Sequence, residues 1–184
     1  MDLKETLDNL IEISSLAGSE ILDVYNGNIN VTLKDDLSPL TDADRRSNEV
    51  IVGKLNDLYP QIPILSEEGK KIEYKDRQKW NVFWLIDPLD GTKEFIKRNG
   101  EFTVNIALIE NGIPIAGVVY APIRDTFWYG AKDLGSFMKK NSLDEIEFKK
   151  LNFEDYAQIK KLDDKNQLYD ERSFDKILYA SNNT

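Results

Sequence analysis

Apolar side chains recur at helical spacing in two segments of the first sixty residues. In residues 3–25, Leu, Ile, Ala and Tyr return every three or four positions, which predicts an amphipathic helix. Asn26-Gly27-Asn28 is a typical stop signal for that helix. A second helix is predicted from Ala43 to Leu58, and Thr41 and Asp44 have the spacing of a capping box at its start.

Shorter apolar runs predict strands between and after these helices. Residues 29–33 alternate in polarity and predict an edge strand, which a loop over residues 34–39 follows. Residues 62–65 predict a short buried strand. Residues 82–86 are a continuous apolar run, which predicts a central strand covered on both faces.

The next segment reads as a β-meander. Three strands are expected, at residues 102–109, 113–120 and 125–130, and Asn111-Gly112 is a strong hairpin signal between the first two. Two helices, short strands and then a meander predict an α+β fold, in which helices pack on a mostly antiparallel sheet.

The amino-acid composition of the chain changes near residue 141. Charged residues dominate from there to residue 172, and residues 177–180 read as a further strand. We therefore expect a first domain over residues 1–140 and a charged segment with the start of a second, incomplete domain over residues 141–184.

Composition narrows the chemistry that the chain can perform. The 184 residues include 41% hydrophobic positions, carry a net charge of −9, and contain neither cysteine nor histidine. The negative charge argues against nucleic-acid binding, which needs a basic surface. Thiolate and imidazole chemistry is excluded, so catalysis would rest on carboxylates, hydroxyls or a hard metal ion held by oxygen atoms.

The N-terminal residues lack the basic start and apolar run of a signal peptide. No stretch approaches the ~20 apolar residues that cross a bilayer. We expect a cytoplasmic protein without an integral membrane segment, with peripheral association at the inner membrane as a further option.

Two carboxylates follow the apolar run at residues 82–86. Asp87-Pro88-Leu89-Asp90-Gly91-Thr92 places them three residues apart, Gly91 permits a tight turn, and Thr92 can start a helix whose N–H groups suit a phosphate. Clustered carboxylates repel each other unless a cation is shared, and Mg²⁺ prefers such oxygen ligands. An aspartate-rich turn without function remains an alternative for this segment taken alone.

Two further acidic motifs are candidates for the same site. Glu67-Glu68 also ends a short apolar strand, and adjacent strands would bring it next to Asp87 and Asp90. A solvated pair of glutamates is the alternative. Asp44 lies at the start of the second predicted helix, where it could serve the capping box and the helix dipole alone.

The ordered set of Thr41-x-x-Asp44, Glu67-Glu68 and the Asp87–Thr92 segment resembles the signature of the inositol monophosphatase superfamily. The run from Trp84 to Phe95, with Lys93-Glu94-Phe95 after Gly-Thr, is similar to the superfamily's bacterial 3'(2'),5'-bisphosphate nucleotidase branch. The match covers roughly residues 3–140. It implies a layered α/β sandwich and a phosphomonoesterase that converts 3'-phosphoadenosine 5'-phosphate to AMP and phosphate.

The resemblance also implies residue roles and cofactors. It implies two or three Mg²⁺ ions, with inhibition by Li⁺, a small phosphorylated nucleotide as substrate, and a homodimer as an option. By position, it assigns catalysis to Glu67, Thr92 and Asp44, metal binding to Glu67, Asp87, Leu89 and Asp90, and substrate contacts to Glu67, Leu89, Asp90, Gly91 and Thr92.

One feature departs from the family pattern. The second half of family members carries a Trp-Asp motif, whereas Trp80, Trp84 and Trp128 of this chain are each followed by another residue. We therefore expect an N-terminal portion whose activity is reduced. An inositol monophosphatase-like enzyme and a non-catalytic metal- or phosphate-binding remnant are the two alternatives.

Overall fold

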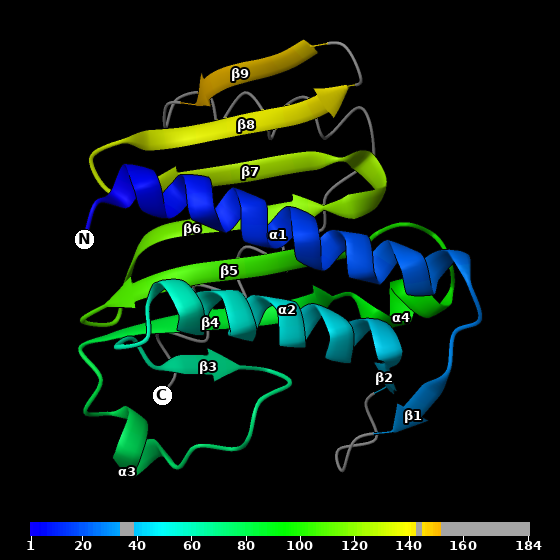
Figure 1. The fold of residues 1–184 in the computed structure, drawn as a ribbon, viewed down its shortest axis with the longest axis horizontal. Coiled ribbons are helices and arrows are strands. Elements are labelled where there is room, and N and C mark those ends of the chain that lie inside the picture. The colour runs from blue at the N-terminus through cyan, green and yellow to red at the C-terminus, as the bar shows by residue number, and fades with distance from the viewer. Residues whose placement is uncertain (34–38, 143–144, 152–184) are drawn as a thin grey trace, which may run out of the picture.

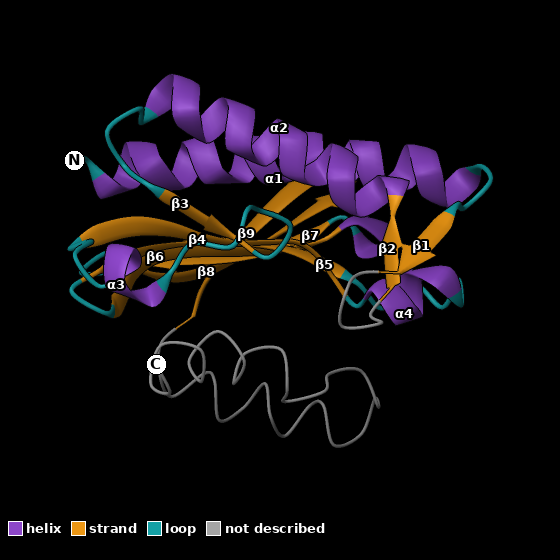
Figure 2. Cartoon of the chain, turned by 90° about the horizontal axis from the view of Figure 1, so that it is seen from below, coloured by secondary structure: helices purple, strands orange, loops and turns teal. Residues whose placement is uncertain are grey.

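The computed structural model describes residues 1–33, 39–142 and 145–151 of the chain. In these residues, two long helices lie side by side on one face of a seven-stranded sheet (Figures 1 and 2). This arrangement confirms the predicted α+β class with helices on a mostly antiparallel sheet. The predicted strand at residues 177–180 and residues 34–38 of the predicted loop lie outside the described residues.

Both long helices begin and end close to the predicted positions. α1 spans Leu3–Asn26, and the Asp2 side chain caps it by accepting from the Lys4 N–H at 2.9 Å. α2 spans Asp42–Leu58 and begins with the predicted capping box. Two short helical segments were not predicted, namely α3 (Tyr74–Arg77) and the 3₁₀ turn η1 (Pro122–Arg124). A third, α4 (Thr92–Ile96), begins at Thr92, where the sequence predicted a helix start.

The strands form two sheets. A small antiparallel pair, β1 (Val31–Leu33) and β2 (Pro39–Thr41), lies at one end of the molecule (Figure 1). Pro39 therefore belongs to a strand rather than to the predicted loop. The large sheet runs in chain order through β3 (Ile64–Ser66), β4 (Val82–Asp90), β5 (Thr103–Glu110), β6 (Ile113–Ala121), β7 (Thr126–Ala131), β8 (Gly135–Ser142) and β9 (Glu145–Leu151).

One neighbouring pair of the large sheet is parallel. β3 and β4 run in the same direction, and every later pair is antiparallel. The hairpin between β5 and β6 turns at Asn111 and Gly112, whose φ angles of 51° and 77° suit the predicted two-residue turn. β8 and β9, which the pattern did not predict, continue the sheet past residue 140, and the domain boundary there stays a prediction.

The burial of β4 differs from the prediction of a strand covered on both faces. Trp84 and Ile86 are buried beneath the helices, whereas Phe83 and Leu85 on the opposite face are only partly buried. β4 also continues through Asp90, where the sequence suggested an end at residue 86. Among the described residues, the helices cover one face of the sheet, so burial alternates along the strand (Figure 2).

The core lies between the sheet and the two helices. One face of α1, including Leu10, Ile13, Ala17 and Ile21, is buried against the sheet. Gly18 allows close approach, because a Cβ there would lie 2.4 Å from the ring of Tyr120 on β6. Burial of such a helix face supplies most of the stability of an amphipathic helix.

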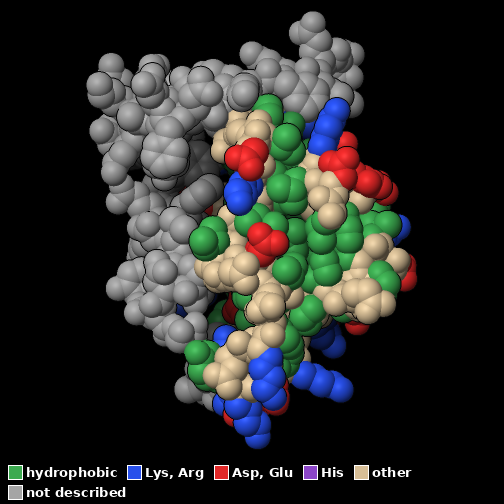
Figure 3. Space-filling model, turned by 90° about the vertical axis from the view of Figure 1, so that its left-hand side faces the viewer, with side chains coloured by type: hydrophobic (Ala, Val, Ile, Leu, Met, Phe, Trp, Pro, Cys, Tyr) green, Lys and Arg blue, Asp and Glu red, His purple; other side chains and the backbone are tan. Residues whose placement is uncertain are grey.

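The surface mixes side chains of all classes. Figure 3 shows the end of the molecule that lies on the left of Figure 1, where hydrophobic side chains are interspersed with acidic and basic ones. Of the side chains that the structure describes, the large hydrophobic ones that are exposed are spread over several elements, and they are Met1, Leu16, Val31, Leu58, Tyr74, Ile113 and Ile123. In the described part of the chain, no helix combines the length and apolar character that a bilayer-crossing segment requires.

Candidate metal and phosphate site

The ends of β3 and β4 lie side by side, as the sequence predicts. Their parallel register pairs Ser66 with Ile86, so Glu67, which follows the last residue of β3, lies level with Asp87 within β4. The Glu67 N–H donates to the Ile86 carbonyl at 3.1 Å, which continues the ladder by one residue. The first carboxylate motif is thereby brought next to the second.

A β-bulge sets the directions of the two aspartates on β4. Asp87 pairs with Asn105 and Asp90 pairs with Thr103, so β4 holds one more residue than β5 between the two pairs. Pro88 lies inside this bulge, where a missing N–H interrupts no regular ladder. The bulge thus allows a proline in an inner strand, and it separates two aspartates of which Asp90 acts on Asp87 through its negative charge.

The Asp87 carboxyl has a strongly perturbed pKa. Burial, followed by the negative charges of Glu67 and Asp90, raises the pKa of Asp87 to about 9. A hydrogen bond with Glu67 acts in the same direction, and a backbone hydrogen bond from Leu89 opposes it. Without a cation, a proton therefore remains on Asp87 at neutral pH and relieves the repulsion among the three carboxylates.

The donor atoms around Asp87 fit a hard cation. The Oδ1 atoms of Asp87 and Asn105 are buried and have no hydrogen-bond partner, although buried polar atoms are normally paired. Asn105 also donates from Nδ2 to Asp90 at 3.4 Å. Carboxylate oxygens, with the carbonyl of Leu89 between them in sequence, are ligands that Mg²⁺ prefers.

These side chains do not form a closed metal cluster. Within residues 1–33, 39–142 and 145–151, no three acidic side chains come together in a ready-made metal-holding group. Glu67 is exposed, whereas Asp87 and Asp90 are partly buried. The donors therefore fit the cation by type and by neighbourhood, and metal binding by Glu67, Asp87, Leu89 and Asp90 stays a prediction.

Gly91 and Thr92 form the start of α4, directly after the bulge. Gly91 caps the helix with φ of 95°, and a Cβ at this position would lie 2.8 Å from the Glu101 carbonyl oxygen. Only glycine combines that backbone angle with such a close approach. Because the first N–H groups of a helix lack intrahelical acceptors, Gly91 and Thr92 can offer backbone donors to an anion.

Asp44 joins the start of α2 to the start of α4. Its Oδ2 accepts from the N–H and the hydroxyl of Thr41, at 2.7 and 2.5 Å, and completes the predicted capping box. Its Oδ1 accepts from the Thr92 hydroxyl at 3.1 Å. The same hydroxyl lies 3.3 Å from the Leu89 carbonyl. Asp44 is thus buried and serves two helices, so capping alone does not describe it.

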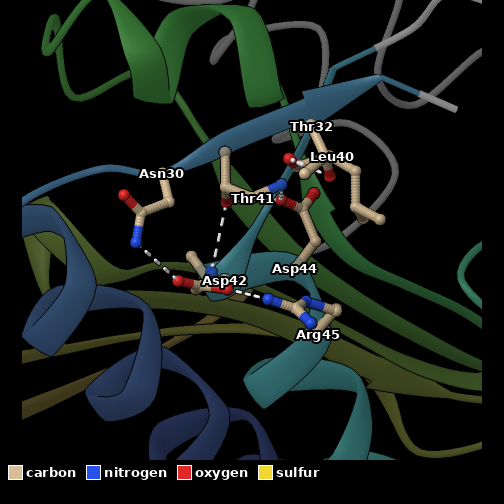
Figure 4. Close-up of polar contacts among 8 residues, drawn as sticks. Asn30, Thr32, Leu40, Thr41, Asp42, Asp44 and Arg45 are labelled. Atoms are coloured by element: carbon tan, nitrogen blue, oxygen red, sulfur yellow. Dashed lines mark hydrogen bonds and ion pairs between the residues drawn. The ribbon is translucent and has the colours of Figure 1, made fainter.

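The surroundings of Asp44 are shown in Figure 4. Asn30 donates to Asp42 at 3.3 Å, Arg45 pairs with Asp42, and Thr32 donates to the Leu40 carbonyl at 3.3 Å across the β1–β2 pair. These contacts hold the small sheet against the first turn of α2. They lie on the outside of the turn, whereas Asp44 points inward to Thr92.

Four polar residues near the site were not singled out from the sequence. Ser47 and Asn48 lie on α2, Ser66 ends β3, and Asn105 lies within β5. Asn105 had a detectable signal, because it is a polar residue inside an otherwise apolar strand. Ser47 had a weaker one, because it falls on the apolar face of its helix.

Comparisons with known proteins place the chain among characterised sequences. A family model described as the inositol monophosphatase family matches residues 2–180. A 3'(2'),5'-bisphosphate nucleotidase CysQ from Escherichia coli (strain K12) is 50% identical over 128 residues, which are 68% of this chain and 52% of that protein. A protein of the same name from Buchnera aphidicola (subsp. Acyrthosiphon pisum, strain APS) is 48% identical over 127 residues, 68% of this chain and 48% of that protein.

A solved structure of a protein from the same family also matches this chain. The crystal structure of CysQ from Bacteroides thetaiotaomicron, described as a bacterial member of the inositol monophosphatase family, matches with a TM-score of 0.66 and 38% sequence identity. The match covers 85% of this chain and 56% of that one. The chain spans about half the length of the curated relatives that it matches.

Proposed function

The chain belongs to the inositol monophosphatase family, as its motifs predict, and we propose that its site hydrolyses a phosphomonoester with the help of Mg²⁺. The proposed substrate is 3'-phosphoadenosine 5'-phosphate, and the proposed products are AMP and inorganic phosphate. In this reaction the bond between phosphorus and the 3' oxygen breaks, water adds to phosphorus, and the leaving oxygen takes up a proton.

One observation carries the proposal. Burial, followed by the negative charges of Glu67 and Asp90 beside the parallel pairing of β3 and β4, raises the pKa of Asp87 to about 9. Strong perturbation by burial and neighbouring charges is typical of functional sites. The causes of the shift at Asp87 are burial first and then the negative charges of two further acids.

The proposed cation would be held by Glu67, Asp87, Asp90 and the carbonyl of Leu89. When bound, Mg²⁺ supplies positive charge that neutralises phosphate and favours deprotonation of water. Asp87 would then lose its proton, because a cation replaces the proton in offsetting the repulsion among the three carboxylates. Two or three ions, and inhibition by Li⁺, remain part of the proposal.

The remaining residues of the site would bind phosphate and position water. Gly91 and Thr92 would donate backbone N–H groups to phosphate oxygens, since they begin α4. The Thr92 hydroxyl donates to Asp44, so its oxygen lone pairs are left to accept a hydrogen bond from water. Asp44 is held by Thr41, and it would in turn keep Thr92 in this orientation.

The substrate class is supported by the names of the relatives. Relatives at 48% and 50% identity carry the name 3'(2'),5'-bisphosphate nucleotidase. Solved structures of proteins named inositol monophosphatase, such as that from Thermotoga maritima, match at 30% identity. We therefore favour a bisphosphate nucleotide over an inositol phosphate as substrate. A cytoplasmic location and a homodimer stay predictions.

The test measures inorganic phosphate released by the purified chain from 3'-phosphoadenosine 5'-phosphate and, separately, from inositol 1-phosphate. Each substrate is tested with Mg²⁺ and with EDTA. Asp90→Asn removes a proposed ligand, and Asp57→Asn is the matched control, because Asp57 is an exposed residue near the far end of α2. We expect Mg²⁺-dependent release from the nucleotide that Asp57→Asn retains and Asp90→Asn loses by about 100-fold or more.

Three other results would change the proposal. Faster release from inositol 1-phosphate would replace the substrate class but keep the reaction. Release that persists in EDTA would contradict the metal dependence. Release no faster than that of Asp90→Asn would favour a non-catalytic metal- or phosphate-binding protein.

A further inference from the structure

Two neighbouring residues of α2 reach the two strand ends that carry the carboxylates. The Ser47 hydroxyl donates to the Pro88 carbonyl at 2.7 Å, in the bulge between Asp87 and Asp90. The Asn48 Oδ1 accepts from the Ser66 hydroxyl at 2.6 Å, immediately before Glu67. One turn of one helix is therefore bonded to both β3 and β4.

The contact at Asn48 extends beyond Ser66. The Ser66 hydroxyl oxygen also accepts from the Glu68 N–H at 3.2 Å, so Glu67 lies between two residues of one hydrogen-bonded chain. The Gly69 N–H donates to the Ser66 carbonyl at 3.1 Å and closes the turn. The backbone on both sides of Glu67 is thus tied, through Ser66, to Asn48.

The bond made by Ser47 is unusual for a serine inside a helix. Such a hydroxyl commonly bonds the carbonyl four residues earlier in its own helix, as Ser14 of α1 does to Leu10 at 2.5 Å. Ser47 is equally buried, with 0% exposure, but bonds a residue 41 positions away in sequence. Its hydroxyl therefore serves the bulge of β4 rather than its own helix.

We propose that Ser47 and Asn48 are positioning residues, which hold the strand ends bearing Asp87, Asp90 and Glu67 at one fixed separation. Like-charged groups move apart unless the backbone that carries them is held. Two bonds from a rigid helix supply that restraint without adding a ligand. This inference rests on the proposed function only in naming the cation that the arrangement would receive.

The first test measures Mg²⁺ affinity by isothermal titration calorimetry, which needs no substrate turnover. Ser47→Ala removes the bond to Pro88, and Asn48→Leu removes the acceptor for Ser66 while keeping a similar volume. Ser14→Ala is the matched control, since it deletes a buried helix hydroxyl of the same kind far from the site in sequence. We expect each of the first two variants to weaken Mg²⁺ binding by about tenfold, and the control to leave it unchanged.

A second pair of variants separates the hydrogen bond from packing. Asn48→Asp keeps the shape and the acceptor, so Mg²⁺ affinity should return to at least the wild-type value. Ser66→Ala combined with Asn48→Leu should weaken binding no more than Ser66→Ala alone, because Ser66→Ala already removes the bond to Asn48. Amide hydrogen exchange at Glu68 should accelerate in Ser66→Ala and not in Ser14→Ala.

The outcomes decide between positioning and mere stability. If Ser47→Ala does not fold, the Asn48 variants carry the test. Wild-type Mg²⁺ affinity in folded Ser47→Ala and Asn48→Leu would overturn the proposal, as would a wild-type chain that binds no Mg²⁺. If wild type binds Mg²⁺ and the variants weaken it but no substrate is hydrolysed, the proposed function fails and this inference stands.

Discussion

At the scale of single residues, Asp87 is the central residue of the candidate cation site. It pairs with Asn105 across the sheet, shares a hydrogen bond with Glu67, and leaves one buried oxygen without a partner. A carboxyl in this setting retains its proton until a cation displaces it. The role of Asp87 can therefore be tested by measuring its protonation state as well as by measuring catalysis.

Asp87 should make the metal-free chain less stable as pH rises. Its pKa of about 9 lies above the ordinary value of 3.8, so the folded chain holds a proton that the unfolded chain releases. The stability that this proton supports is complete below about pH 4 and is lost as pH rises through about 9. In EDTA at about pH 8, Asp87→Asn should raise the free energy of unfolding by several kcal/mol.

Urea unfolding of both proteins at acid and alkaline pH measures this effect. The gap between Asp87→Asn and wild type should shrink toward pH 4, where both side chains are neutral. Asp57→Asn, which changes an exposed carboxylate, should show no such trend. A gap that is independent of pH would show that Asp87 is ionised in the folded chain.

Thr92 should matter for turnover through its hydroxyl group. The hydroxyl donates to Asp44, and Thr92→Val keeps the shape while removing that donor and the oxygen offered to water. We expect Thr92→Val to lower kcat by about 100-fold, and Thr92→Ser to retain most of it. Steady-state kinetics and thermal unfolding of both variants check this, and equal kcat values in the two would contradict it.

At the scale of elements, the bulge in β4 and the start of α4 determine where the site residues point. Asp87 and Asp90 lie on either side of the bulge, and Gly91 turns the chain at once into α4. Phe95, the buried residue of α4, packs against Tyr25 of α1 and Phe102, with ring centroids 5.3 and 5.2 Å away. The short helix is thus anchored to the core although it has little hydrogen bonding of its own.

Substitution of Gly91 should cost more than substitution of another glycine with positive φ. Gly91→Ala combines backbone strain at φ 95° with a Cβ 2.8 Å from the Glu101 carbonyl, whereas Gly112→Ala has φ of 77° and no atom within 4 Å. We expect losses of about 3 kcal/mol and about 1 kcal/mol of unfolding free energy, respectively. Chemical denaturation measures both, and equal losses would mean that the close approach relaxes without cost.

Local patterns predicted most elements because each carries its own signal. The helical periodicity of α1, the capping box at Thr41 and the turn at Asn111-Gly112 depend only on neighbouring residues. The continuation of β4 past Pro88 was missed, because proline usually ends an inner strand and the bulge that accommodates it depends on pairing with β5. β8 was missed since its lysines and serines do not alternate with a regular apolar face.

The candidate site, like the fold, could be predicted from the sequence only in part. The acidic residues could be predicted because strand ends and motif order mark them in the sequence. The contacts of Ser47 with Pro88 and of Asn48 with Ser66 could not, because they depend on how α2 lies over two strands far away in the chain. The double role of Asp44 likewise requires the 48-residue separation from Thr92 to be closed by folding.

At the scale of the whole molecule, the net charge and the length of the chain both bear on the proposed reaction. The chain carries a net charge of −9, so a polyanionic nucleotide would be repelled unless cations gather at the site. It spans about half the length of its curated relatives, and Glu67, Asp87, Asp90 and Thr92 all lie within residues 2–180, which the family model matches. The cation site can therefore be tested on this chain directly.

The most direct test is the number of protons released when Mg²⁺ binds. Isothermal titration at about pH 7.5 in buffers of different ionisation enthalpy gives that number. We predict release of about one proton from wild type, because the pKa of Asp87 near 9 falls when the cation binds, and none from Asp87→Asn. Mg²⁺ binding without proton release, or no binding at all, would contradict a cation site built around Asp87.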